Sequence, residues 1–186
     1  MSRSFTFVLR TPTRRTVVRP AGWEDIEGMA RVSVDTWRLT YKDILPRAYL
    51  ERMRLNEHEN QRSRLMLAPG VHHFVAVEPS VGEVVGFVSC GPTRGGGVAS
   101  GEVYELYVQR GFQGRGLGRR LLRAAMDRLA RDGHDNMIVW VLNQNPNLPF
   151  YPRLGGWRHA GKTIRVGGAL VDETAYVWRL SRSNRP

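Results

Sequence analysis

The sequence predicts an α/β (α+β) fold in which a central mixed, mostly antiparallel sheet is flanked by helices. Stretches with an apolar period of about 3.6 residues alternate with short apolar runs that are typical of buried strands. Two of those runs are separated by a tight turn, which predicts an antiparallel hairpin. A third run leads through a glycine-rich loop into an amphipathic helix. Helices and strands are therefore interleaved along one chain.

The N-terminal third is predicted to be mainly helical after one short strand at residues 16–19. Residues 23–41 carry apolar side chains at helical spacing, and residues 47–67 are again predominantly helical. The Pro69-Gly70 pair closes this region as a turn, because proline ends a helix and glycine adopts turn conformations freely. We therefore expect the helical segments to precede most of the sheet.

Strands dominate from residue 73 onward. The predicted strands are 74–77, 84–88, 102–108, 137–142, 157–166 and 170–180. Between the third and the fourth of them, residues 117–130 repeat leucine and alanine at helical spacing until Gly133, a natural left-handed helix stop. Residues 145–154 form a short helix or turn broken by three prolines, and Gly167-Gly168 joins the last two strands.

Length and composition indicate a single globular domain without disulfides. The 186 residues are 41% hydrophobic and 24% charged, which is typical of a chain that buries its own core. We expect a flexible N-terminal extension at 1–15, one domain at 16–181 and a C-terminal tail at 182–186. Cys90 is the only cysteine, so an internal disulfide is excluded and a buried thiol is expected. With no apolar run long enough for a signal peptide or a membrane span, we expect a soluble, cytoplasmic protein with no membrane partner.

The formal net charge of +11 raises the question of a polyanionic partner. A basic nucleic-acid-binding protein gathers its charge on one face, whereas these arginines are dispersed along the chain. Local clusters occur only at Arg14-Arg15, at Arg119-Arg120 and in the last few residues. A solvated basic surface explains this charge, and no specific nucleic-acid partner is expected.

The glycine-rich loop at residues 113–118 carries the clearest chemical signal in the chain. Its glycines let backbone N–H groups approach an anion, and the first turn of the following helix leaves its own N–H groups unpaired. The loop suits a ligand with a pyrophosphate, although a purely structural turn can use the same glycines. A P-loop is excluded because no Gly-Lys-Ser/Thr follows. A dinucleotide fingerprint is excluded because the loop comes late, after an antiparallel hairpin.

A series of motifs in the second half resembles the acetyl-CoA core of the GNAT superfamily of N-acetyltransferases. The strand EVYELYV at 102–108 precedes the pattern Gln113-x-x-Gly116-x-Gly118 and a long amphipathic helix. The motifs that follow in matching order are WVL at 140–142, Asn145-Pro146, Phe150-Tyr151 and LGGW at 154–157. The resemblance covers about residues 100–160 and implies the family's fold, whose sheet splays apart at its two central parallel strands.

The resemblance implies that acetyl-CoA binds as the co-substrate, without a metal. The backbone of Leu106, Tyr107 and Val108 is expected to pair with the pantetheine arm, and an N–H of this segment is expected to polarise the acetyl carbonyl. Asn145 is expected to contact the same arm. The loop is expected to hold the pyrophosphate through backbone N–H groups, with charge added by two arginines that otherwise are plain solvated residues. Its members are Gln113, Gly114, Arg115, Gly116, Leu117, Gly118 and Arg119.

The same resemblance suggests the catalytic groups. Tyr151 aligns with a tyrosine that acts as general acid, and a phenol with an ordinary pKa of about 10 keeps its proton at neutral pH. Prolines at 149 and 152 depart from the family pattern, so the helix around Tyr151 is expected to be short or distorted. Glu102 lies where relatives carry the carboxylate that receives the amine proton, often through water. Glu105 is the rival, but three residues along a strand point to opposite faces, so both are not expected to line one site.

Trp37, Arg38 and Tyr41 fall in the segment that, by resemblance, forms one wall of the acceptor pocket. Trp37 and Tyr41 are four residues apart and share a helix face, which plain helix packing explains equally well. The expected acceptor is a small-molecule amine or a peptide N-terminus, and a homodimer is compatible with the resemblance. A CoA-binding sensor without catalysis and a basic nucleic-acid-binding protein are the alternative functions. The scattered histidines show no metal-ligand spacing.

Overall fold

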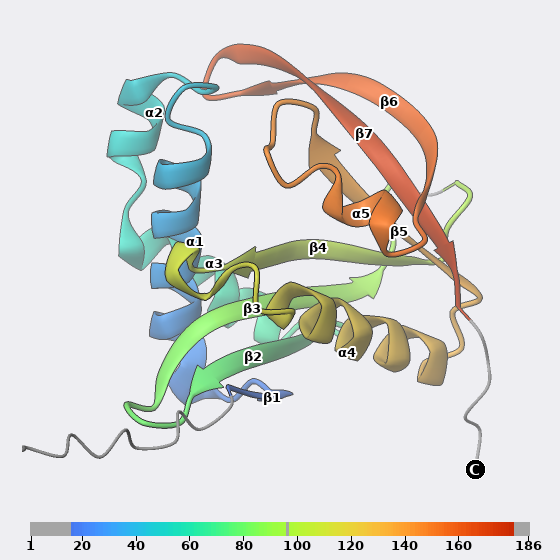
Figure 1. Ribbon diagram of the computed structural model, residues 1–186, viewed down its shortest axis with the longest axis horizontal. Coiled ribbons are helices and arrows are strands. Elements are labelled where there is room, and N and C mark those ends of the chain that lie inside the picture. The colour runs from blue at the N-terminus through green and yellow to red at the C-terminus, as the bar shows by residue number, and fades with distance from the viewer. Residues whose placement is uncertain (1–15, 96, 181–186) are drawn as a thin grey trace, which may run out of the picture.

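The computed structural model describes residues 16–95 and 97–180 (Figure 1). The extension predicted at 1–15 and the tail predicted at 182–186 lie outside the described residues. The helical elements are η1 (Trp23–Asp25), α1 (Ile26–Thr40), α2 (Arg47–Arg52), α3 (Leu55–Met66), η2 (Arg110–Phe112), α4 (Leu117–Arg131) and α5 (Phe150–Arg153). The strands are β1 (Val17–Pro20), β2 (His72–Glu78), β3 (Glu83–Pro92), β4 (Gly101–Val108), β5 (Asn136–Leu142), β6 (Trp157–Val166) and β7 (Ala169–Arg179).

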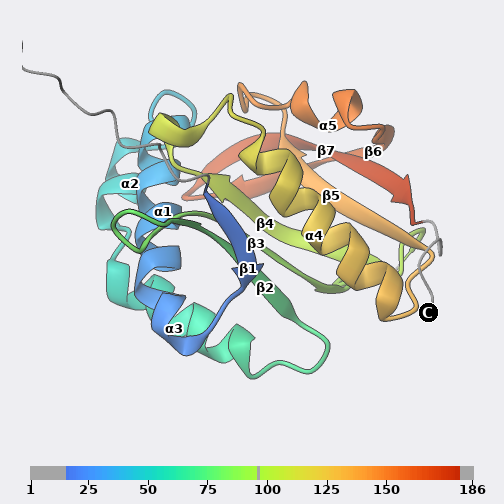
Figure 2. The same ribbon diagram turned by 60° about the horizontal axis from the view of Figure 1, so that its bottom comes forward.

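The seven strands form one mixed sheet in the order β1-β2-β3-β4-β5-β7-β6. All neighbouring strands are antiparallel except β4 and β5, which run parallel near the centre. Helices α1 and α3 lie against one face of the sheet, and α4 crosses the other face (Figure 2). The predicted mixed, mostly antiparallel sheet flanked by helices is therefore confirmed.

The two parallel strands separate soon after they begin. Backbone pairing joins residues 101–103 of β4 to residues 137–139 of β5 and goes no further. Beyond that point β4 continues beside β3 as far as Val108, and β5 continues beside β7 as far as Leu142. The splay that the family resemblance implied is therefore present. As a result, the second halves of β4 and β5 form no backbone hydrogen bonds with each other.

A β-bulge changes which way the side chains of β4 point. Ser89 of β3 pairs with Glu105 and its neighbour Cys90 pairs with Val103, so that Tyr104 is the extra residue. An extra residue shifts the alternation of faces by one position. As a result Val103, Leu106 and Val108 pack in the core beneath α4. Glu102, Glu105 and Tyr107 face the side covered by α1 and α3.

The helical region predicted at 47–67 is broken into α2 and α3. Met53 and Arg54 between them have extended backbone conformations, with ψ angles of 117° and 137°. No proline or glycine causes the break. Met53 is instead buried among residues of α1, α2 and β7, and its carbonyl accepts a hydrogen bond from Arg38 at 2.8 Å. Tertiary contacts therefore override the local helical tendency at this point.

The largest part of the core lies between α4 and the sheet. Leu121, Leu122, Ala125 and Leu129 are fully buried on one face of α4, as their spacing predicts. Cys90 is buried in the same cluster, and burial raises the pKa of its thiol to about 12.

The helices α1 and α4 have 15 residues each. Nowhere in the described part of the chain is a helix long and apolar enough to cross a membrane.

Candidate functional site

A cleft of about 1000 Å³ opens where β4 and β5 separate. Its walls come from α1, β4, the loop before α4, β5, α5 and the β6-β7 hairpin. Among the predicted site residues, those lining it are Trp37, Tyr41, Glu102, Leu106, Tyr107, Val108, Gln113, Gly114, Gly116, Leu117, Gly118, Arg119, Asn145 and Tyr151. Segments that are more than 100 residues apart in the sequence thus meet around one cavity.

The glycine loop forms one end of this cleft. Gln113 anchors it by donating a side-chain hydrogen bond to the Val108 carbonyl at 2.9 Å. Gly114 and Gly116 have φ angles of 72° and 76°, which residues with a Cβ adopt only with strain. Gly116 caps α4, and the N–H of Arg120 is the first to bond back to its carbonyl, at 3.1 Å. Within the described chain, the backbone N–H groups of Leu117, Gly118 and Arg119 have no hydrogen-bond partner.

The two arginines of the loop region, Arg115 and Arg119, differ in whether they line the cleft. Arg119 lines the cleft, whereas Arg115 does not and instead places its guanidinium 5.6 Å from the centre of the Phe112 ring. A Cβ at Gly118 would lie 3.3 Å from the Phe150 ring, which is tighter than ordinary packing. Gly118 therefore allows the loop and α5 to approach each other closely.

Tyr151 is held by aromatic neighbours in the short helix α5. Its ring stacks on Tyr176 with 5.8 Å between ring centres, and Phe150 and Trp178 meet it edge-on. The helix has only four residues, as the flanking prolines predict. No hydrogen bond to the Tyr151 hydroxyl occurs within the described residues. Burial, together with the nearby Tyr41 phenol, raises the pKa of Tyr151. The hydroxyl therefore stays protonated at neutral pH.

Aromatic residues in α1, directly after it and in β4 form one wall of the cleft. Asn145 donates its side-chain amide to the Tyr41 hydroxyl at 2.9 Å, which ties the loop after β5 to the end of α1. Trp37 donates its indole N–H to the Tyr107 hydroxyl at 2.7 Å and meets Tyr41 edge-on at 5.0 Å. Burial raises the pKa of both tyrosines, and their hydrogen-bond partners only partly offset this effect. This wall is thus aromatic and uncharged at neutral pH.

Arg38 lies away from the cleft, contrary to its predicted place in the acceptor wall. Its guanidinium donates to the carbonyls of Leu50 and Met53, at 3.2 Å and 2.8 Å. It lines a separate small pocket beside α2. Because Arg38 follows Trp37 on the helix, it points about 100° away around the helix axis. Its contacts fix the C-terminal end of α2.

Glu102 and Glu105 both line the cleft, so the expectation that they face opposite sides of the strand is wrong. The bulge at Tyr104 supplies the extra residue that returns Glu105 to the face of Glu102. Both oxygens of Glu102 are occupied by Arg94, whose backbone N–H donates at 2.8 Å and whose guanidinium donates at 2.5 Å. Glu102 is therefore fully paired, and it sits where β4 and β5 are still joined, opposite Ile138.

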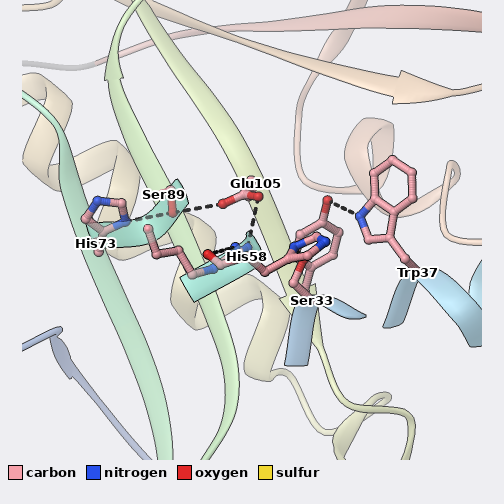
Figure 3. Close-up of polar contacts among 8 residues, drawn as sticks. Ser33, Trp37, His58, His73, Ser89 and Glu105 are labelled. Carbon is pink, nitrogen blue, oxygen red and sulfur yellow. Dashed lines mark hydrogen bonds and ion pairs between the residues drawn. The ribbon is translucent and has the colours of Figure 1, made fainter. Parts of the chain in front are cut away.

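Glu105 has a different environment (Figure 3). One carboxylate oxygen accepts from the guanidinium of Arg62 at 3.0 Å, and the other accepts from the Ser89 hydroxyl at 3.4 Å. The Arg62 side chain is completely buried, while 15% of the Glu105 side chain is exposed. Burial raises the pKa of Glu105, and Arg62, Ser89 and Arg94 oppose this in part. Glu105 is thus a buried carboxylate at the point where the strands part.

The cleft is also lined by charged residues that sequence motifs did not indicate. Lys162 of β6 pairs with Glu173 of β7 at 3.2 Å and lies 4.0 Å from the centre of the Trp140 ring. Arg94 similarly covers the Tyr104 ring at 4.3 Å. Arg94 comes from the loop after β3, and Lys162 and Glu173 come from the β6-β7 hairpin; neither segment carries a recognisable sequence motif. Within the described ranges, no three His, Cys, Asp or Glu side chains cluster in a way that could hold a metal ion.

Comparison with known proteins agrees with this architecture. The model of the acetyltransferase (GNAT) family matches residues 31–156, well over half of the chain. The chain is 37% identical over 163 residues to the uncharacterized N-acetyltransferase YuaI of Bacillus subtilis (strain 168). This match covers 87% of the present chain and 91% of that protein.

Two solved structures share the fold at low sequence identity. One is the PaiA N-acetyltransferase of Thermoplasma acidophilum in complex with coenzyme A, with a TM-score of 0.64 and 20% identity over 86% of this chain and 97% of that one. The other is a phosphinothricin acetyltransferase of Sinorhizobium meliloti in complex with acetyl-CoA. It has a TM-score of 0.70 and 18% identity over 92% of each chain.

Proposed function

This chain belongs to the acetyltransferase (GNAT) family, and from that membership we propose that it transfers the acetyl group of acetyl-CoA to a primary amine. One observation carries the proposal: the glycine loop, the splayed strands and Tyr151 all line the same cleft. That coenzyme A and acetyl-CoA are present in the PaiA and phosphinothricin acetyltransferase complexes supports the choice of co-substrate.

The residues of the cleft fit the parts of acetyl-CoA. The free N–H groups of the loop and the N-terminus of α4 suit the pyrophosphate, and Arg119 adds positive charge beside them. Among the described residues, no strand pairs with the backbone of Leu106, Tyr107 and Val108 on the side of β5, so this backbone can pair with the extended pantetheine arm. Asn145, already oriented by Tyr41, is available to the same arm.

The chemistry then requires a proton acceptor and a proton donor. Acetyl-CoA supplies a thioester whose carbonyl carbon is attacked by the free amine, so that a C–N bond forms and the C–S bond breaks. A backbone N–H of β4 stabilises the negative charge that develops on the carbonyl oxygen. Glu105 takes the proton that the amine nitrogen loses, directly or through a water. Tyr151 donates its hydroxyl proton to the leaving sulfur and regains a proton from solvent.

We assign the proton acceptor to Glu105 in preference to Glu102. Glu102 has both oxygens bound by Arg94 and lies in the joined part of the parallel pair. Glu105 lies three residues further along β4, beside the segment proposed to hold the pantetheine arm. Its raised pKa also brings it closer to that of a useful general base, because proton transfer is most efficient when the pKa lies near the working pH.

Coupled release of CoA tests the proposed function. With acetyl-CoA and a panel of primary amines that includes amino acids, polyamines and peptides with free N-termini, we expect thiol release that depends on the added amine. Acetylated product should appear in equal amount by mass spectrometry. Tight CoA binding without turnover on any amine would instead indicate a CoA-binding sensor. Affinity for nucleic acid that falls steeply with salt would point to the polyanion-binding alternative.

Gly116→Ala provides a test of the loop. Because φ at Gly116 is 76°, an added Cβ strains the backbone, and we expect the free energy of unfolding to fall by about 1 kcal/mol. The displaced N–H groups should also weaken CoA binding by about tenfold, equivalent to about 1.4 kcal/mol. Gly111→Ala is the matched control, because that glycine is equally open but has no positive φ. Denaturant unfolding and calorimetric titration measure both effects, and equal behaviour of the two variants would contradict the role of Gly116.

A further inference from the structure

A row of buried polar side chains extends from the cleft into the sheet (Figure 3). The Ser89 hydroxyl lies 3.4 Å from one oxygen of Glu105 and 2.8 Å from Nδ1 of His73. Ser89 is fully buried and only 6% of His73 is exposed. The catalytic scheme described above uses neither of them. Such groups are unusual in a sheet interior, because an unpaired buried polar group is costly.

Strand register explains why these three side chains meet. His73 of β2 is the direct partner of Ser89 in β3, and Ser89 is the direct partner of Glu105 in β4. Directly opposed residues on one face of a sheet lie about 5 Å apart and contact each other. Glu105 joins this row only because the bulge at Tyr104 shifts the alternation of β4. The bulge therefore brings together the carboxylate and the Ser89-His73 pair.

The hydrogen-bonding capacity of each group determines which one donates and which one accepts along the row. An ionised carboxylate is the strongest acceptor present, so the Ser89 proton is directed to Glu105. His73 must then donate its Nδ1–H to the Ser89 oxygen, because Ser89 has only one proton to give. Burial lowers the pKa of His73, which therefore remains neutral with a single N–H. Its Nε2 is buried without a hydrogen-bond partner in the described chain, and a contact with the backbone of Leu65 opposes the lowering of the pKa in part.

We propose, on the basis of the proposed function, that Ser89 and His73 are positioning residues that hold Glu105 in its ionised form and correct orientation. His73 fixes the rotation of the Ser89 hydroxyl, and Ser89 hydrogen-bonds the Glu105 oxygen that Arg62 leaves free. The other charged and titratable groups that act on this site are Arg62 of α3, Arg94 after β3, Tyr107 of β4 and His72, the neighbour of His73 in β2. Arg62 supplies the opposite charge, while the Ser89-His73 pair supplies the second, neutral contact.

The titration of Glu105 tests the proposal without any acceptor amine. Carbon-detected NMR of the whole protein, with the resonance assigned by its loss in Glu105→Gln, gives the pKa of the carboxyl group. Ser89→Ala removes a hydrogen bond to the charged form, so we expect the pKa to rise by about half to one unit, up to a tenfold change in proton affinity. His73→Leu should cause a smaller rise, whereas His73→Asn, whose amide can replace Nδ1–H, should stay close to the wild type.

Ser33→Ala is the matched control. Ser33 of α1 forms a second serine-histidine contact in the same layer, 3.4 Å from Nδ1 of His58, and does not touch Glu105 (Figure 3). It should leave the titration of Glu105 unchanged. An unshifted pKa in both Ser89→Ala and His73→Leu would overturn the proposal. A nitrogen NMR spectrum that shows the proton of His73 on Nε2 would overturn the assigned direction of the row.

Kinetics separate this inference from the assignment of Glu105 itself. If Glu105 is the proton acceptor, Ser89→Ala should move the acidic limb of kcat/KM to higher pH, with acetyl-CoA affinity unchanged. Turnover on that limb should fall up to tenfold, while the plateau at higher pH changes little. A merely structural role would lower turnover equally at all pH values. Wild-type turnover in Glu105→Gln would remove the catalytic assignment, whereas a shifted NMR titration would still support the positioning contact.

Discussion

Tyr151→Phe is expected to lower kcat by about 100-fold or more, the usual range for losing a general acid. The hydroxyl is the only group removed, and it faces a cleft in which no other described residue hydrogen-bonds to it. The departing thiolate leaves more easily when a proton donor stabilises it. Because burial raises the pKa of Tyr151, its proton remains in place over the whole neutral range. Steady-state kinetics with a saturating amine measures the loss.

Affinity and stability should be nearly unchanged in this variant. The phenylalanine ring keeps the stack on Tyr176 and the edge contact with Trp178, and it adds no unsatisfied polar group. The dissociation constant of CoA and the thermal midpoint are therefore expected to match those of the wild type. Tyr176→Phe is the matched control, since it removes a phenol from the same stack without altering the lining of the cleft. Equal kcat in Tyr151→Phe and the wild type would show that the sulfur receives its proton from another source.

Local patterns predicted those parts of the fold that depend on short stretches of sequence. The turn at Gly167-Gly168 needs two positive φ angles, which are 56° and 92°, and glycine is the residue that supplies them. The burial of Leu121 and Leu129 on α4 follows from helical spacing. The loop before α4 could also be predicted from the sequence, because its proposed role depends on backbone N–H groups and requires glycine at fixed positions. Arg115 and Arg119 could not be told apart in this way, since both are solvated long side chains.

The features that sequence did not reveal depend on tertiary contacts. The bulge at Tyr104 is set by the pairing of β3 with β4, and no residue type within EVYELYV requires it. A strict alternation therefore placed Glu105 on the wrong face. The break at Met53 similarly arises from burial and from the hydrogen bond that Arg38 donates. Lys162 reached the cleft from a hairpin whose sequence shows only strand periodicity.

Glu105→Gln is expected to lower kcat/KM by about 100-fold or more and to remove the acidic limb of its pH profile. An ordinary glutamate side chain has a pKa of about 4.3. Because the pKa of Glu105 is raised, the acidic limb of the wild type lies at a higher pH than this value. Activity is present above this pKa, where the carboxylate is ionised, and is lost as the pH falls through it. Glutamine cannot accept the proton. The residual turnover should then follow only the fraction of free amine, without the inflection that a titrating carboxylate adds.

Glu102→Gln distinguishes the two carboxylates. The substitution leaves the guanidinium of Arg94, 64% exposed as a side chain, facing an amide oxygen in place of the carboxylate, so we expect a change mainly in the KM of the acceptor while the acidic limb remains. The fold of each variant is checked by thermal unfolding, because Glu105→Gln leaves the buried Arg62 paired only with an amide oxygen. Loss of the limb in Glu102→Gln and its survival in Glu105→Gln would return the role of proton acceptor to Glu102. The bulge would then serve to position Glu105 and Arg62 as a structural pair beside the reacting groups.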